Sequence, residues 1–218
     1  MRVAINGFGR IGRSVFRILN SRKNVSVVAI NDIADNDVMV YLLKYDTVMG
    51  PFKDSVTLDG DVMKTSTNEI KMVAERDPSQ LPWDNLNVDI VIEATGVFRL
   101  RSQLQQHINA GAKRVILTVP SKDEIDYTLV IGVNDDGLTD DHKIISNASC
   151  TTNCLAPMAK ILNDSFGIEY GVINTIHAYT NDQRLADVPH SDWRRSRAAA
   201  ENIIPTTTGA ARAVGKVL

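Results

Sequence analysis

The chain has 218 residues, of which 44% are hydrophobic and 23% are charged, and its formal net charge is −2. A chain of this length forms one large domain or two modest ones, each with a real hydrophobic core. The balanced charge argues against a nucleic acid or a membrane surface as the main partner. No window has the apolar length of a membrane helix or a secretory signal, so we expect a cytoplasmic protein.

The only two cysteines, Cys150 and Cys154, are four residues apart. On one helix their Cβ atoms would lie about 5–6 Å apart, whereas a disulfide needs about 3.5–4.5 Å. We therefore expect two reduced thiols, as is usual in the cytosol. No metal site is expected.

The first part of the chain alternates apolar strands with amphipathic helices. The pattern predicts strands at residues 3–5, 25–30, 88–94, 115–119, 129–133 and 143–146, and helices from residue 11, at 38–43 and at 102–110. Residues 51–73 read as short polar strands with turns at Asp59-Gly60 and Thr67-Asn68. Such alternation is typical of an α/β fold with a doubly wound, mostly parallel sheet of the Rossmann type.

From Cys150 the pattern changes. We expect a helix from Cys150 to about Phe166, a strand at residues 171–177, a long polar loop to Ile203 and a helix starting near Gly209. The predicted domains are therefore residues 1–148 and residues 149–218.

The segment from Gly7 to Gly12 reads G-x-G-x-x-G, follows a predicted strand and opens a predicted helix. In a dinucleotide-binding turn, Gly7 would permit the tight turn and Gly9 would let a pyrophosphate approach the backbone. Gly12 would let helix and strand pack closely, and the helix N-terminus would face the phosphates. The alternative is a packing turn without a ligand.

Asp32 lies twenty residues after Gly12, at the end of the second predicted strand. A carboxylate there accepts hydrogen bonds from the adenosine ribose and repels a 2′-phosphate. We therefore expect NAD as the cofactor rather than NADP. The alternative for Asp32 is an ordinary surface aspartate.

Cys150 stands where an apolar strand gives way to small polar residues and a helix begins. The positive field of a helix N-terminus stabilises a thiolate, and Ser149 and Thr151 offer hydroxyl groups to an anionic substrate. Cys154, one turn further along beside Leu155, should be inert. From these residues alone, Cys150 is either a reactive thiol or a structural one.

His177 ends a predicted apolar strand and leads into polar residues, so it is either a general base or a structural histidine. Its spacing from Cys150 does not by itself bring the two together. The other histidines, His107, His142 and His190, lie in polar surroundings and are expected at the surface.

These motifs, with residues 177–181 and 203–211, resemble the glyceraldehyde-3-phosphate dehydrogenase family over the whole chain. The resemblance implies a nucleophile at Cys150 and a base at His177. It implies cofactor contacts at Gly7, Gly9, Arg10, Ile11, Gly12, Asp32, Arg76, Thr95, Gly96 and Thr118. It implies substrate-phosphate contacts at Thr180 and Arg195, and inorganic-phosphate contacts at Ser149, Thr151, Thr208 and Gly209.

The implied reaction is the NAD-dependent conversion of glyceraldehyde 3-phosphate and inorganic phosphate to 1,3-bisphosphoglycerate through a cysteine thioester. Residues 149–218 would then begin an α+β catalytic domain that continues beyond Leu218 in the family. We therefore expect these 218 residues to bind NAD without full turnover. The loop of about residues 179–202 would pack against a second copy in a homotetramer, and its arginines at 194–197 are a poorer match to a nucleic-acid surface.

Two rival functions remain from the sequence. Erythrose-4-phosphate dehydrogenases share the cysteine block but differ at the Thr208-Gly209 motif, so we favour the glyceraldehyde 3-phosphate enzyme. A non-catalytic NAD-binding or interaction protein is the other rival.

Overall fold

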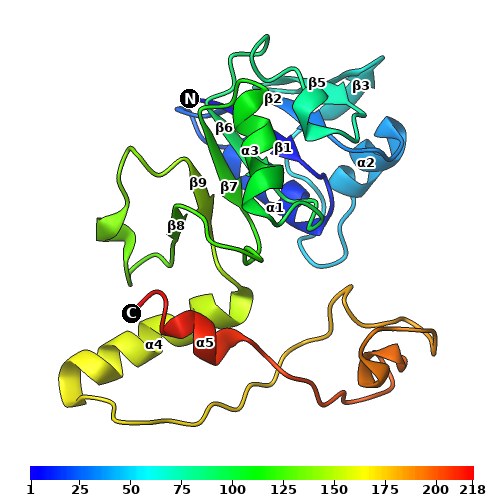
Figure 1. The fold of residues 1–218 in the computed structure, drawn as a ribbon. Helices are drawn as coiled ribbons and strands as arrows, with labels where there is room; N and C mark the ends of the chain where they lie inside the picture. Colours follow the sequence, from blue (N-terminus) through cyan, green and yellow to red (C-terminus); the bar gives the residue numbers. More distant parts are fainter. The chain divides into compact units, whose positions relative to one another are not determined.

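The computed structural model describes residues 1–218, which divide into two compact units, Met1–Ser149 and Cys150–Leu218 (Figure 1). Each unit is described here by itself. No helix in either unit combines the length and the apolar character needed to cross a bilayer.

The first unit is built on a nine-stranded sheet with the order β3-β4-β5-β2-β1-β6-β7-β9-β8. The strands are β1 (Arg2–Asn6), β2 (Ser26–Asn31), β3 (Val56–Asp59), β4 (Val62–Thr65), β5 (Glu69–Val73), β6 (Ile90–Glu93), β7 (Arg114–Leu117), β8 (Tyr127–Thr128) and β9 (Ile144–Ser146). Only the β3–β4 and β4–β5 pairs are antiparallel, and every other pair is parallel. The mostly parallel α/β sheet expected from the sequence is confirmed.

Three helices connect the parallel strands: α1 (Arg10–Leu19), α2 (Asn36–Lys44) and α3 (Arg101–Asn109). One apolar cluster joins Phe16 of α1 and Leu43 of α2 to Ile5 of β1. A second cluster joins Leu104 of α3 to Ala4, the neighbour of Ile5 along the strand. Because successive side chains of a strand point to opposite faces, the two clusters cover opposite faces of one sheet, which is a doubly wound arrangement.

The strand predicted at residues 129–133 is wrong. The paired residues are Tyr127 and Thr128, after which the chain turns, with Gly132 at φ +79°. The Asn134 side chain closes this turn, because its Oδ1 accepts the Val130 N–H at 2.9 Å and its Nδ2 donates to the Thr128 carbonyl at 2.9 Å. A local side-chain hydrogen-bond system therefore replaces the ladder that the apolar residues suggested.

His107, expected at the surface, is another correction, because its side chain on α3 is completely buried. Its two ring nitrogens lie within hydrogen-bond distance of Trp83 and Glu93. The residues around His107 on α3 are mostly polar, so the sequence pattern did not indicate that this side chain faces the core.

The second unit contains α4 (Cys150–Phe166) and α5 (Ala210–Val214), with a short 3₁₀ turn η3 (Trp193–Ser196) in the long loop between them. Two more 3₁₀ turns, η1 (Pro78–Gln80) and η2 (Asp135–Gly137), belong to the first unit. The strand predicted at residues 171–177 is absent, since no segment of the second unit pairs with it and its apolar side chains, such as Val172 and Ile176, are exposed. A strand needs a partner for its N–H and C=O groups, which an apolar sequence pattern does not supply.

Candidate active site

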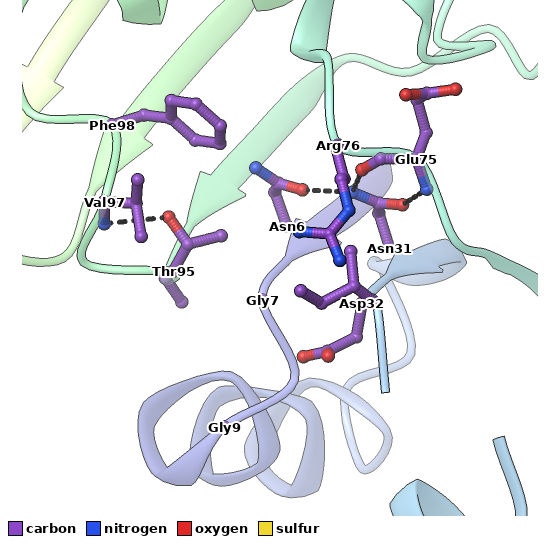
Figure 2. Close-up of a pocket in the computed structure, with 12 residues that line it drawn as sticks. Asn6, Gly7, Gly9, Asn31, Asp32, Glu75, Arg76, Thr95, Val97 and Phe98 are labelled. Carbon is purple, nitrogen blue, oxygen red and sulfur yellow. Dashed lines mark hydrogen bonds between the residues drawn. The ribbon is translucent and has the colours of Figure 1, made fainter. Parts of the chain in front are cut away.

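One candidate ligand pocket lies at the carboxyl ends of β1, β2 and β6, with a volume of about 410 Å³ (Figure 2). In parallel α/β sheets, ligands bind at this edge, where the strand order reverses. The pocket is lined by Asn6, Gly7, Gly9, Asn31, Asp32, Ile33, Glu75, Arg76, Ala94, Thr95, Val97 and Phe98.

The three motif glycines meet different surroundings. Gly7 has φ +91°, and a Cβ there would lie 2.6 Å from the Thr95 nitrogen. A Cβ on Gly12 would lie 2.1 Å from the Gly7 carbonyl oxygen, so Gly12 permits the contact between α1 and the turn. Gly9 has an ordinary φ of −70° and nothing within 4 Å of its Cβ position. The open space at Gly9 is a cradle that suits a close-approaching phosphate group.

Alanine at Gly9 and at Gly12 should therefore have opposite effects. Gly12→Ala forces backbone apart and should lower the free energy of unfolding by about 2 kcal/mol or more. Gly9→Ala should leave stability nearly unchanged, yet weaken NAD binding by about tenfold or more, because its methyl group enters the phosphate space. Urea unfolding and calorimetric titration of both variants measure the two effects. Undiminished NAD binding by Gly9→Ala would contradict a phosphate position at this turn.

Asp32, directly after β2, accepts a hydrogen bond from the glycine turn. Its Oδ2 accepts the Phe8 N–H at 2.7 Å, and its Oδ1 accepts the Ala34 N–H at 3.0 Å. The carboxylate is thus oriented toward the pocket by backbone donors on both sides. Its contact with a ribose stays a prediction.

Two asparagines missed by sequence reasoning form the pocket floor. Asn31 Nδ2 donates to Asn6 Oδ1 at 2.7 Å and to the Glu75 carbonyl at 2.8 Å, while Asn31 Oδ1 accepts the Glu75 N–H at 2.8 Å (Figure 2). Both asparagines end apolar strands at the binding edge of the sheet. That position was the signal that could have revealed them.

Some residues expected at the cofactor do not line this pocket: Arg10, Ile11, Gly12, Gly96 and Thr118. Arg10 pairs with Asp46, at 2.5 Å between Nη1 and Oδ2. Thr118 ties the end of β7 to β6, because its N–H and hydroxyl both donate to the Glu93 carbonyl at 3.0 Å.

In the second unit, Cys150 is the first residue of α4, and its Sγ lies 3.3 Å from His177 Nε2. His177 Nδ1 lies 2.6 Å from the Ala178 carbonyl oxygen. A carbonyl only accepts, so Nδ1 carries a proton and Nε2 is the nitrogen that faces the thiol. The structure therefore brings together the two residues whose spacing in sequence left their proximity open.

The contact between Cys150 and His177 shifts the pKa values of both groups. Partial burial raises the pKa of the Cys150 thiol, but hydrogen bonds with His177 and Thr151 outweigh burial and bring that pKa below its ordinary value. The hydrogen bond to the Ala178 carbonyl raises the pKa of His177, and the contact with Cys150 raises it further. Both directions favour a thiolate beside an imidazolium, at a helix N-terminus that also favours negative charge.

Cys150 and His177 line a second hollow of about 240 Å³ formed within this unit, together with Thr151, Cys154, Leu155, Met158 and residues 173–176. Cys154 is exposed, as is Cys150. Its difference from Cys150 is that no histidine hydrogen-bonds to its sulfur.

The residues expected at the substrate phosphate gather around Asp182. Arg195 forms an ion pair with Asp182, and its Nε and Nη2 donate to Thr206 Oγ1 at 2.9 and 2.8 Å. Thr180 Oγ1 accepts the Asp182 N–H at 3.3 Å. The structure thus places Thr180 and Arg195 in one cluster, in which Arg195 is paired with Asp182.

The residues expected at inorganic phosphate stand at the starts of two helices. Ser149 precedes α4, and Thr151 Oγ1 lies 4.0 Å from Cys150 Sγ. Gly209 precedes α5, and Thr208 Oγ1 accepts the Ala210 N–H at 3.2 Å. Their ligand contacts stay predictions.

Comparison with known proteins assigns both parts of the chain to one family. Residues 1–101 match the family model described as glyceraldehyde 3-phosphate dehydrogenase, NAD binding domain, and residues 149–218 match the C-terminal domain of the same family. The chain belongs to the glyceraldehyde-3-phosphate dehydrogenase family. Over 100% of its length, it is 56% identical to a glyceraldehyde-3-phosphate dehydrogenase of Borreliella burgdorferi, and over 99% it is 57% identical to one of Thermotoga maritima.

The chain spans 66% and 65% of the lengths of these two glyceraldehyde-3-phosphate dehydrogenases. The NAD-binding family model covers every residue of the 410 Å³ pocket, so NAD is the cofactor for which this domain is built. The model of the C-terminal domain covers the Cys150–His177 pair.

Proposed function

We propose that the protein carrying this chain is a phosphorylating glyceraldehyde-3-phosphate dehydrogenase of glycolysis. The observation that carries the proposal is the 3.3 Å contact between Cys150 Sγ and His177 Nε2 at the start of α4, in a chain with an NAD-binding domain. A thiolate nucleophile with an adjacent base is the requirement for oxidising an aldehyde through a covalent thioester.

In the proposed mechanism, the Cys150 thiolate forms an S–C bond to the aldehyde carbon, the carbonyl π bond breaks, and the oxygen takes the Nε2 proton of the His177 imidazolium to give a hemithioacetal. His177 Nε2, now neutral, takes back the hydroxyl proton as the C–H bond is broken and the C=O bond re-forms. NAD, when bound, supplies the acceptor for the hydride. The resulting thioester is attacked by a phosphate oxygen, the C–S bond breaks, and Cys150 returns as thiolate while an acyl phosphate leaves. The N-terminus of α4 favours negative charge and would stabilise the oxyanion of each addition.

The proposed anion contacts divide between the two clusters of the second unit. Thr180 and Arg195 would hold the phosphate of the substrate, with Asp182 as the present counter-ion of the arginine. Ser149, Thr151, Thr208 and Gly209 would receive inorganic phosphate.

The exposed loop around Trp193 and Arg194 supports the proposal of a homotetramer, and no feature favours a nucleic acid or a membrane. We place the enzyme in the cytoplasm.

A substrate assay on the complete protein tests this function. Sustained NADH formation should require glyceraldehyde 3-phosphate, NAD and inorganic phosphate together, because phosphate is the group that releases the thioester. Without phosphate, NADH formation should stop after a single turnover. NADP in place of NAD should give a rate lower by about tenfold or more, since Asp32 opposes a 2′-phosphate. A preference for erythrose 4-phosphate would support the first rival instead. NAD binding without oxidation of either aldehyde would support the non-catalytic rival.

A further inference from the structure

A chain of buried polar side chains leads from the core under α3 to the floor of the NAD pocket. Trp83, His107, Glu93 and Asn6 are all 0% exposed, and Asn31 is 5% exposed. The proposed chemistry uses none of them. A buried carboxylate such as Glu93 is costly unless its oxygens accept several hydrogen bonds, so its partners reveal what it does.

Glu93, the last residue of β6, receives hydrogen bonds at both oxygens. Its Oε2 lies 2.6 Å from Asn6 Nδ2 and 3.1 Å from His107 Nε2. Its Oε1 accepts the Thr95 N–H at 2.8 Å and also the Thr95 hydroxyl. The carboxylate therefore links one side chain of the pocket floor, one turn of the pocket wall and one histidine of the core.

Trp83 determines which nitrogen of His107 carries the proton. The indole Nε1–H only donates, and it lies 3.0 Å from His107 Nδ1. Nδ1 is therefore the acceptor, the proton is on Nε2, and Nε2 donates to Glu93. Every group that contacts the carboxylate is thus a donor.

The hydrogen bonds of Glu93 also determine how the side chains of the pocket floor are oriented. Because Asn6 turns its NH₂ toward Glu93, its Oδ1 faces Asn31, whose Nδ2 donates to it at 2.7 Å. Asn31 then holds both the N–H and the C=O of Glu75, next to Arg76 in the pocket wall (Figure 2). The other oxygen of Glu93 holds Thr95, whose hydroxyl oxygen accepts the Val97 N–H at 3.1 Å.

We propose that Glu93 is the positioning residue of the NAD pocket. Backed by His107 and Trp83, it sets the orientation of the side chains that hold the Glu75–Arg76 wall and the Thr95–Val97 wall. Glu93 does not line the pocket, so it acts through Asn6, Asn31 and Thr95. The inference rests on the proposed NAD site.

Glu93→Gln tests the proposal with almost no change of shape. Its NH₂ group would face either Asn6 Nδ2 and His107 Nε2 or the Thr95 N–H, so a donor meets a donor in both orientations. NAD binding to the whole chain should weaken by about tenfold to hundredfold in calorimetric titration, as for a buried hydrogen bond left unmade. Val115→Ala, a core truncation in the apolar cluster beside α3, is the matched control for lost stability and should bind NAD as the parent does.

Adding Trp83→Phe distinguishes positioning from simple loss of stability. Without the indole donor, the His107 proton can move to Nδ1, and Nε2 can accept from the glutamine. This removes the conflict at His107 and leaves the conflict at Asn6, so the expected recovery is partial. Trp83→Phe/Glu93→Gln should therefore bind NAD at least about threefold more tightly than Glu93→Gln, although it carries a further core change. A structural role alone predicts weaker binding in the double variant, and that result would overturn the proposal.

The tautomer of His107 is measurable by ¹⁵N resonance of the imidazole ring and needs no variant that folds poorly. The parent should carry the proton on Nε2, and the double variant should carry it on Nδ1. A parent with the proton on Nδ1 would overturn the proposal whatever the binding results. Failure of the parent itself to bind NAD would reject the proposed cofactor site, whereas equal binding by parent and Glu93→Gln would reject only the role of Glu93.

Discussion

Cys150→Ser is expected to lower the rate of NADH formation by the complete protein by about 10⁴-fold or more. A serine hydroxyl at the start of α4 keeps its proton at neutral pH, and His177 as partner does not make it a nucleophile equal to a thiolate. Without the S–C bond there is neither hemithioacetal nor thioester, so later steps cannot compensate. The rate is measured by NADH absorbance at saturating substrates.

Cys154→Ser provides the matched control for this variant. Cys154 is on the same helix one turn later, is also exposed, and has no hydrogen bond to a histidine. It should keep most of the parent activity, and both variants should bind NAD as the parent does, because neither sulfur lines the 410 Å³ pocket. Substantial activity in Cys150→Ser would contradict the covalent mechanism.

His177→Asn is expected to have the second-largest effect, lowering turnover of the complete protein by about 10²- to 10⁴-fold, as for loss of a general base. The same change should move the pH dependence of Cys150 alkylation. In the parent, the lowered pKa of Cys150 means that thiolate persists at lower pH and alkylation slows as pH falls through that pKa. Removing the imidazole removes the main cause of the lowering, so the midpoint should move to higher pH.

Iodoacetamide labelling followed by mass spectrometry measures this shift on the 218-residue chain itself. At pH 6, Cys150 should react more than about tenfold faster in the parent than in His177→Asn. Cys154 serves as the internal reference, with equal rates in the two proteins. The same midpoint for Cys150 in both proteins would show that the 3.3 Å contact does not control its ionisation.

The local patterns of the sequence were sufficient for much of the first unit and for the start of the second. The glycine turn, the two turns between β3, β4 and β5, and the helix that begins at Cys150 all depend on residues adjacent in sequence. A glycine at a turn, or small polar residues before an apolar helix, acts over a few residues. Such features are visible in one segment read alone.

Other features were decided by contacts between distant segments. Residues 171–177 have the composition of a strand and yet form none in the second unit, because pairing needs a second segment. Residues 129–133 are a local exception, because they lost their predicted strand to the side chain of the adjacent Asn134. His107 lies on a helix whose sequence looks polar, and only packing against Trp83 and Glu93 places it in the core.

The two sites show the same division. The sequence by itself determined the identity of the cofactor turn and the position of Cys150 at a helix start, because backbone conformation there follows from short-range preferences. Only the tertiary structure decided that His177 meets Cys150 at 3.3 Å and that Glu93 meets Asn6 at 2.6 Å. These pairs are 27 and 87 residues apart in the chain, and hydrogen bonds over such separations depend on how whole elements pack rather than on any local pattern.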